Sequence, residues 1–336
     1  SSAASDVYKR QFLQNRLTFC ADIFERKVTD ILIPGGKDYP ALIGDDNLPF
    51  ENAGVLKTTG FELQAKWSDK LSNGFAYSVG VALSDDKAEV LSYPSNPTNK
   101  IGDGVLYKGY TVGDIWGYET GGILQESDFD GVGPNGKPLY HGAYFKGGQP
   151  YPGYVWYQDL DHDGVITSGL STVDDPGDKK VIGNNAPRYR YNITANFQYK
   201  GFDLDLMFQG VGKRDYWLKD VSSYWGGGAG SWETYNQSWT PERTDAKFPM
   251  YGSGIGSYAQ SGYLLDASYI KLKQVILGYT FPKALIGKVG LKKLRLNIAA
   301  YNLFTLSDVP KYYDSDYLSD AYPPKRTFSV GIQVGF

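Results

Sequence analysis

Hydrophobic and polar residues alternate along much of this 336-residue chain. In residues 61–67, for example, Phe61 and Leu63 flank the charged Glu62. A period of two places successive side chains on opposite faces of a β-strand, so that one face is apolar and the other polar. We therefore predict an all-β protein. The alternation predicts strands at 17–23, 61–67, 75–84, 191–199, 202–209, 269–281, 294–300 and 328–336.

The predicted strands are about ten residues long, which is enough to cross a bilayer when the strand is tilted. The segments between them are of two kinds. Short turns are predicted at 69–74 and 200–201. Long loops are predicted at 34–57, 120–153, 158–187, 212–262 and 306–325. Because outer-membrane barrels combine short periplasmic turns with long extracellular loops, this asymmetry favours an antiparallel transmembrane β-barrel. A secreted carbohydrate-binding β-sandwich is the alternative.

The alternation changes phase inside one predicted strand. Ile270 and Leu272 have one parity, whereas Val275 and Leu277 have the other. One extra residue in a strand shifts the parity in this way. We therefore predict a β-bulge near residues 273–274.

Composition narrows the class of protein further. The chain has 34 Lys and Arg against 37 Asp and Glu, a net charge of −3, so we predict no nucleic-acid partner. One cysteine excludes a disulfide-bonded scaffold. A mean hydropathy of −0.38, without an apolar run of about 18 residues, excludes membrane-spanning helices. The 28 Tyr and 41 Gly fit the aromatic girdles and turns of a β-barrel.

Residues 1–11 (SSAASDVYKRQ) read as a leader that is foreign to the rest of the chain. Residues 6–11 have the sequence that a common transposase end would encode if it were translated. We predict a non-native leader at 1–11 and one barrel domain at 12–336, without a plug domain. An ordinary polar leader is the alternative.

An acidic loop at 159–166 (DLDHDGVI) resembles the first half of an EF-hand calcium loop. Asp159, Asp161 and Asp163 would offer carboxylate oxygens to the ion, and Val165 would offer its carbonyl oxygen. The twelfth position is a leucine rather than the usual glutamate, so a later aspartate would have to replace it. The later candidates are Asp174, Asp175 and Asp178. The alternative is an acidic turn held by side-chain hydrogen bonds. We predict that the chain requires no cofactor but can bind calcium here.

Several aromatic residues fall in segments between the predicted strands, where they could stack on sugar rings or pack the loops together. The candidates for substrate binding are Trp116, Tyr118, Trp225, Trp232 and Trp239. Paired carboxylates such as Asp203 and Asp205 could serve a glycosidase. Charged residues are ordinary inside a barrel lumen, and we therefore predict that the protein is not an enzyme.

The end of the chain carries a candidate assembly signal. Gly331, Val334 and Phe336 form a pattern of glycine, apolar residue and terminal aromatic residue. This pattern resembles the signal by which outer-membrane barrels are recognised for assembly. The alternative is a buried final strand that ends in phenylalanine.

A series of short segments, in order along residues 12–336, resembles one protein family. The most specific segment is 265–279 (LDASYIKLKQVILGY). The others are 54–63 (GVLKTTGFEL), 109–118 (GYTVGDIWGY), 156–166, 181–189 (VIGNNAPRY), 201–204, 208–210, 239–242, 246–249, 302–305 and 322–324. Together they resemble the C-terminal portion of a SusC/RagA-type TonB-dependent outer-membrane transporter of Bacteroidetes.

The resemblance implies a barrel of about 22 strands with an N-terminal plug, of which this chain would supply about ten strands. It implies a location in the outer membrane of a Gram-negative bacterium, in contact with outer-membrane lipid. The TonB complex would supply energy through the missing N-terminal part. A SusD-like surface lipoprotein would be the partner, and the substrate would be an oligosaccharide or, as the alternative, a peptide.

Overall fold

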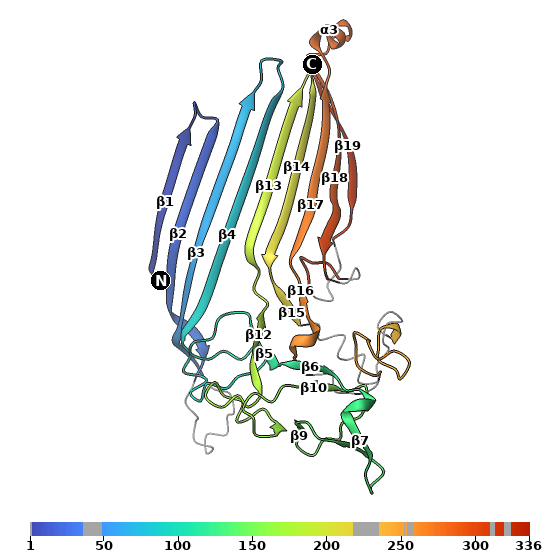
Figure 1. Ribbon diagram of the computed structural model, residues 1–336. Coiled ribbons are helices and arrows are strands. Elements are labelled where there is room, and N and C mark those ends of the chain that lie inside the picture. The colour runs from blue at the N-terminus through green and yellow to red at the C-terminus, as the bar shows by residue number, and fades with distance from the viewer. Residues whose placement is uncertain are drawn as a thin grey trace.

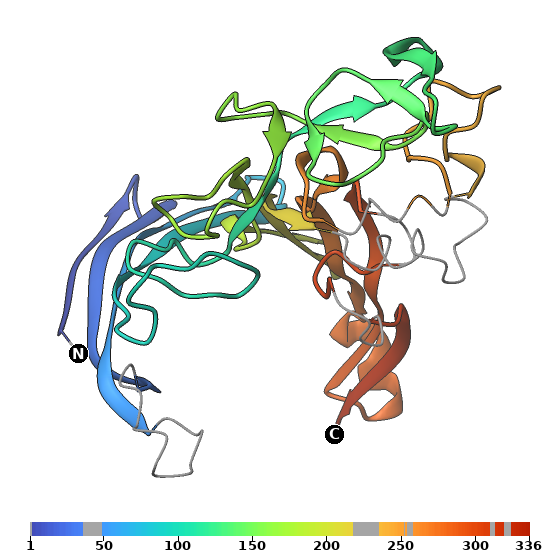
Figure 2. The same ribbon diagram turned by 90° about the horizontal axis from the view of Figure 1, so that it is seen from below.

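A curved antiparallel sheet forms the body of the computed structural model, which describes residues 2–35, 49–217, 235–251, 253, 258–309, 313–318 and 324–336. In spatial order its strands are β1 (Ser2–Phe12), β2 (Leu17–Pro34), β3 (Phe50–Lys70), β4 (Ala76–Ser92), β13 (Arg188–Tyr199), β14 (Phe202–Lys213), β17 (Tyr269–Thr280), β18 (Lys293–Ser307) and β19 (Thr327–Gly335). Figure 1 shows these strands side by side, and Figure 2 shows that the sheet curves into an open arc. The predicted all-β, antiparallel fold is confirmed, with nine strands in the described part against about ten predicted.

The alternation sorts the side chains of this sheet between an apolar and a polar face. Leu277, Ile298 and Val330 are ladder partners on three neighbouring strands, so they form a row on one face. Their exposed fractions are 47%, 57% and 76%. Such a row is unfavourable in water but is the normal outer surface of a membrane barrel. A sheet that leaves its apolar side open differs from the two stacked layers of a β-sandwich.

The predicted β-bulge is present at Lys273. Met207 pairs with Gln274 and Phe208 pairs with Leu272, which leaves Lys273 as the extra residue opposite β14. The ladder with β18 shifts between the same two residues of β17. The change of parity in the sequence therefore has the structural cause that we expected.

The long connections at one end of the sheet fold into a group of two-stranded sheets, which we call the loop module (Figure 1). Its strand pairs are β5 (Asp114–Tyr118) with β12 (Lys179–Asn184), β6 (Thr120–Ile123) with β10 (Val155–Tyr157), β7 (Phe129–Val132) with β8 (Pro138–Tyr140), β9 (Tyr144–Phe145) with β11 (Val165–Ile166), and β15 (Asp215–Trp217) with β16 (Leu264–Asp266). A small apolar core holds the module together. It contains Tyr118, Val155, Tyr157, Ile166, Trp217 and Tyr263.

The strands at the N-terminal side of the sheet are longer than predicted. The alternation placed a loop at 34–57, whereas β2 continues to Pro34 and β3 already begins at Phe50. A strand that extends beyond the lipid has water on both faces, so its sequence need not alternate. The predicted loops at 120–153 and 158–187 also contain strands, but these are too short to show a period.

The helices that lie wholly within the described residues are short. They are α3 (Lys283–Ile286) and the 3₁₀ turns η2 (Glu126–Asp128), η4 (Ser261–Tyr263) and η5 (Gly287–Val289). None of the helices in the described ranges is long and apolar enough to cross a membrane.

The predicted leader lies in β1. This strand pairs with β2 along its length, from Ser2 opposite Lys27 to Phe12 opposite Leu17. Pairing of this kind does not depend on where a sequence comes from, so the non-native origin of residues 1–11 stays a prediction, as does the division at residue 12.

Candidate functional site

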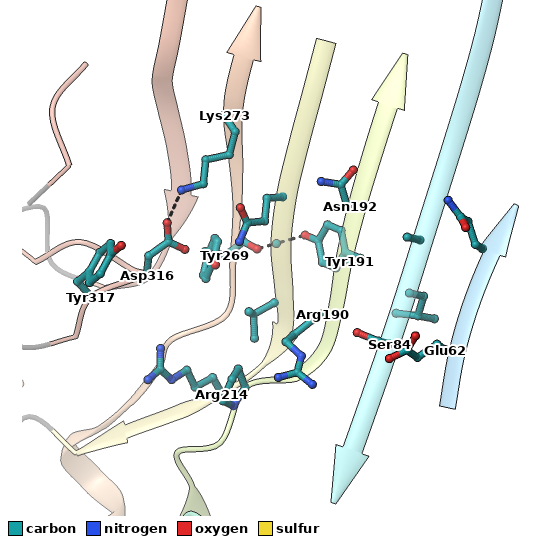
Figure 3. Close-up of a pocket in the computed structure, with 17 residues that line it drawn as sticks. Glu62, Ser84, Arg190, Tyr191, Asn192, Arg214, Tyr269, Lys273, Asp316 and Tyr317 are labelled. Carbon is teal, nitrogen blue, oxygen red and sulfur yellow. Dashed lines mark hydrogen bonds and ion pairs between the residues drawn. The ribbon is translucent and has the colours of Figure 1, made fainter. Parts of the chain in front are cut away.

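A hollow of about 890 Å³ opens on the polar face of the sheet, near the end that carries the loop module. Strands β3, β4, β13, β14 and β17 and the loop segment 313–318 contribute to its wall. Figure 3 labels the side chains of Glu62, Ser84, Arg190, Tyr191, Asn192, Arg214, Tyr269, Lys273, Asp316 and Tyr317 around it.

The floor of the hollow follows from strand register. One row of ladder partners crosses five strands, from Gln64 through Ala82, Asn192 and Gln209 to Lys271. Ladder partners share a face, so the amide groups of this row line the same side of the sheet. The polar half of the alternation therefore becomes a continuous polar surface.

Two of the basic residues around the hollow are neutralised by carboxylates. Arg190 forms an ion pair with Asp86 on β4. The Nζ atom of Lys273 lies 2.6 Å from Oδ2 of Asp316, the pair joined by a dashed line in Figure 3. Each of these charges is already balanced before a ligand arrives.

Arg214 differs from these two residues. It lies between β14 and β15, where the chain leaves the large sheet for the loop module. Its Nε atom donates a hydrogen bond to the main-chain oxygen of Asn185 at 3.0 Å. Among the described residues it forms no ion pair, and burial lowers the pKa of its guanidinium. The hollow therefore contains one half-buried cation without a bound carboxylate in the described chain.

A charged cluster fastens the loop segment 313–318 to β17. Lys271, which is 1% exposed, donates from Nζ to Asp314 at 2.9 and 3.0 Å and to Asp316 at 3.0 Å. Burial acts to raise the pKa of Asp316, but hydrogen bonds from Lys273, Tyr269 and Lys271 outweigh burial and lower it. The sequence analysis missed this cluster. The matching spacing of Lys271 and Lys273 with Asp314 and Asp316 could have indicated it.

The predicted substrate-binding aromatic residues have different surroundings. Trp116 lines a second hollow of about 610 Å³, which also contains Tyr110, Asp103, Asp114 and Asn185. The Trp116 Nε1 atom donates to the hydroxyl of Tyr107 at 2.9 Å, which fixes the ring. An aromatic ring among carboxylate and amide groups suits a sugar, whose faces are apolar and whose edges carry hydroxyl groups.

Tyr118 and Trp239, the other aromatic candidates within the described residues, do not line this second hollow. Tyr118 and Trp239 are each 3% exposed. This burial fits the alternative that these aromatic residues pack the loops together. Burial raises the pKa of Tyr118 to about 12, and Trp239 donates from Nε1 to Gln125 at 2.9 Å. Trp225 and Trp232 lie outside the described residues.

The acidic loop brings three carboxylates together. Oxygens of Asp159, Asp161 and Asp178 lie within 4.8 Å of one another. Asp178 was one of the later aspartates considered as a replacement for the missing glutamate, and it is fully buried. The carboxylate of Asp163 lies outside this group and instead accepts a hydrogen bond from the amide of Val165 at 2.8 Å.

Main-chain amides also bind all three clustered carboxylates. Asp161 accepts from Asp163 at 3.2 Å. Asp159 accepts from His162 and Gly164 at 2.7 and 2.9 Å. Asp178 accepts from Leu160 and Thr167 at 2.8 and 2.7 Å. These bonds preform the loop but also fit the alternative of an acidic turn, so calcium binding stays a prediction.

The residues of the predicted assembly signal lie on or just after β19. Val334 and Phe336 are 47% and 83% exposed. Gly331 lies opposite Asn297 in the ladder, and a Cβ atom on it would come within 2.5 Å of the Asn297 Oδ1 atom. The final strand is thus exposed rather than buried, while its role in assembly stays a prediction.

Comparisons with known proteins bear on these observations. No family model matches the chain. It is 27% identical, over 96% of its length, to "TonB-dependent receptor P3" of Formosa agariphila, and covers 32% of that protein. It is 24% identical, over 97% of its length, to "TonB-dependent receptor SusC" of Bacteroides thetaiotaomicron, and covers 31% of it. The chain therefore spans about a third of the length of these relatives.

Solved structures show the same fold. A chain in the structure of the RagAB peptide transporter aligns with 99% of this chain at a TM-score of 0.74 and 20% identity, and 35% of that chain is covered. The RagAB peptide importer in its "open-open" state aligns at a TM-score of 0.73. The predicted location, the outer membrane of a Gram-negative bacterium, agrees with these relatives. The sequence relatives and the fold thus agree, and the resemblance of this chain to the SusC/RagA-type TonB-dependent receptors is confirmed.

Proposed function

We propose that this chain forms part of the barrel wall and extracellular loops of a TonB-dependent importer in the outer membrane. The observation that carries the proposal is the pairing of an exposed apolar face with a polar hollow beneath a folded loop module. One face suits outer-membrane lipid, and the other suits a water-filled path. The names of the relatives support a role in uptake rather than in catalysis, and we assign the chain no catalytic step.

The path would follow the polar face of the sheet. Substrate would be captured between the loop module and a SusD-like surface lipoprotein. The TonB complex, acting on a plug outside this chain, would then open the lumen. Glu62 and Lys66 of β3 and the Asp203–Arg295 ion pair would line the route. Because these groups are charged or paired by hydrogen bonds, they keep water in the path and give a polar substrate alternative partners.

An oligosaccharide is the substrate that we favour, with a peptide as the alternative. The second hollow supports a sugar, because the Trp116 ring lies there beside the acidic side chains of Asp103 and Asp114 and the Asn185 amide. A peptide is supported by the structural likeness to a transporter whose name states that it carries peptides. Calcium bound by the acidic loop would stiffen the loop module.

Deletion of the gene for the full-length receptor would test this function. We expect the deletion strain to lose growth on one class of nutrient, oligosaccharide or peptide, and a strain without the TonB complex to lose the same growth. Return of the intact gene should restore growth, whereas a Trp116→Ala gene should restore it poorly on an oligosaccharide. Growth that does not change after deletion of either gene, on all oligosaccharides and peptides tried, would contradict the proposal.

A further inference from the structure

The guanidinium of Arg214, which has no carboxylate partner among the described residues, is the feature of the hollow that the fold itself does not explain. Arg190 and Lys273 have carboxylate partners, whereas the hydrogen bond that Arg214 forms within the described ranges uses Nε. Its two Nη groups carry four N–H donors in a flat fork. In Figure 3, Arg214 lies below Tyr269 at the edge of the hollow.

Burial makes this arrangement unfavourable without a partner. A charged group that loses water is stabilised when an opposite charge or several hydrogen bonds replace that water. Burial already lowers the pKa of the Arg214 guanidinium, which reports the same desolvation. Asp316 is near enough to attract it but is bound to Lys271 and Lys273 instead. A flat anion that reached the Nη groups would supply the missing partner.

We propose that Arg214 is the specificity-determining residue for a carboxylate group carried by the imported substrate. This inference rests on the proposed function. A guanidinium binds a carboxylate through two parallel N–H···O bonds, which a neutral hydroxyl or amide group does not match. The amide groups of Asn192 and Gln209 line the same hollow and can bind the polar groups beside such a carboxylate. The recognised group belongs to an acidic sugar or to an acidic side chain of a peptide, since both present the same two oxygens.

The charge of Glu62, on the other side of the hollow, is compatible with carboxylate binding at Arg214. Glu62 lies across the hollow from Arg214 in Figure 3 and is exposed to solvent. Its repulsion of an anion is weakened by water and salt at that distance. A carboxylate is therefore drawn to the Arg214 side of the hollow rather than to its centre.

The test uses the full-length receptor purified in detergent and four probes in two matched pairs. Trigalacturonate is compared with its uncharged methyl ester. A blocked peptide, acetyl-Ala-Ala-Glu-Ala-Ala-amide, is compared with the same peptide containing Gln. Calorimetry measures binding to the unchanged receptor, to Arg214→Gln and to Arg16→Gln. Arg16 is the matched control, because its ion pair with Asp69 lies at the β1–β2 turn, away from the loop module.

We expect the unchanged receptor to bind the acidic member of one pair about tenfold or more tightly than the neutral member. Arg214→Gln should remove that difference and leave binding of the neutral member unchanged, while Arg16→Gln should keep the difference. The pair that shows the effect identifies the source of the carboxylate. Neutral binding also reports whether the variant is folded.

Two results would overturn the inference. One is an unchanged receptor that does not prefer the acidic member in either pair. The other is an Arg214→Gln receptor that keeps the preference. Neither result touches the growth test above, so import by the receptor can stand while the assignment of Arg214 falls.

Discussion

Lys271 and Asp314 are 43 residues apart in sequence, and the lysine donates to both carboxylate oxygens of the aspartate, at 2.9 and 3.0 Å. The lysine is buried on β17, while the aspartate belongs to the loop after β18. The pair therefore ties the loop segment 313–318 to the wall of the sheet, next to the hollow.

Replacement of Lys271 by methionine should destabilise this tie strongly. The substitution leaves Asp314 and Asp316 largely buried without their shared cation, which typically costs about 3–5 kcal/mol. We expect the free energy of unfolding in detergent to fall by about this amount. Lys273→Met is the matched control and should cost less, because Asp316 keeps its bond to Lys271. Equal losses for the two variants would contradict this account.

The same segment should loosen in acid. The pKa of Asp316 is lowered in the folded protein and is about 3.9 for a free aspartate. Its stabilising contribution is therefore complete above the free value and is lost as the pH falls through the lowered value. Hydrogen exchange of residues 313–318, corrected for the intrinsic rate, should rise below about pH 4. In Asp316→Asn it should be high already at pH 7. A wild-type segment with constant protection down to pH 3 would argue against this role.

Gly210 on β14 should not tolerate a side chain. A Cβ atom there would collide with the ring of Tyr191 and come within 2.5 Å of the main-chain oxygen of Tyr269. Overpacking of this kind costs about 1–3 kcal/mol, so Gly210→Ala should lower the unfolding temperature. Gly212→Ala, two residues further along the same strand, is the control, since its nearest contact would be 3.1 Å away. A smaller effect at Gly210 than at Gly212 would refute the steric explanation.

Calcium titration separates the two readings of the acidic loop. If the loop binds the ion, calorimetry should show binding at millimolar calcium or below, and Asp159→Asn should weaken it about tenfold or more. Asp174→Asn lies outside the carboxylate group and should leave binding unchanged. Chelation should then lower the melting temperature of the wild-type receptor and of Asp174→Asn, but not that of Asp159→Asn. Heats no larger than those of dilution would establish an acidic turn.

Local sequence pattern was enough for most of the large sheet, although it did not predict β1 (Ser2–Phe12). The parity change that indicated a bulge at Lys273 is a direct consequence of strand geometry, and so is the apolar row at Ile298. The start of β3 at Phe50 was missed, because a strand in water on both faces has no reason to alternate. The short strands of the loop module were missed because two to six residues contain no measurable period.

The candidate site was harder to predict than the fold. Trp116 was recognised from its residue type, whereas Arg214 gave no signal in the sequence. Arg214 differs from the other basic residues of the hollow because no carboxylate in the described part of the chain pairs with it. The presence or absence of such a partner depends on three-dimensional contacts. Tyr118 is an aromatic residue of the same segment as Trp116, yet it packs into the core of the loop module. Burial by distant segments decides such cases, and no local pattern encodes it.

The length of β3 has a consequence for how the receptor meets its surroundings. A tilted strand crosses the hydrocarbon layer with about 9–11 residues, and β3 has 21. The surplus of about ten residues, at ~3.3 Å each, adds roughly 30 Å of strand, which stays paired with β2 as far as Pro34. Because the two strands are hydrogen-bonded to each other, this extension is stiffer than an unpaired loop of the same length. It would hold the end of the sheet that carries the loop module clear of the lipid headgroups.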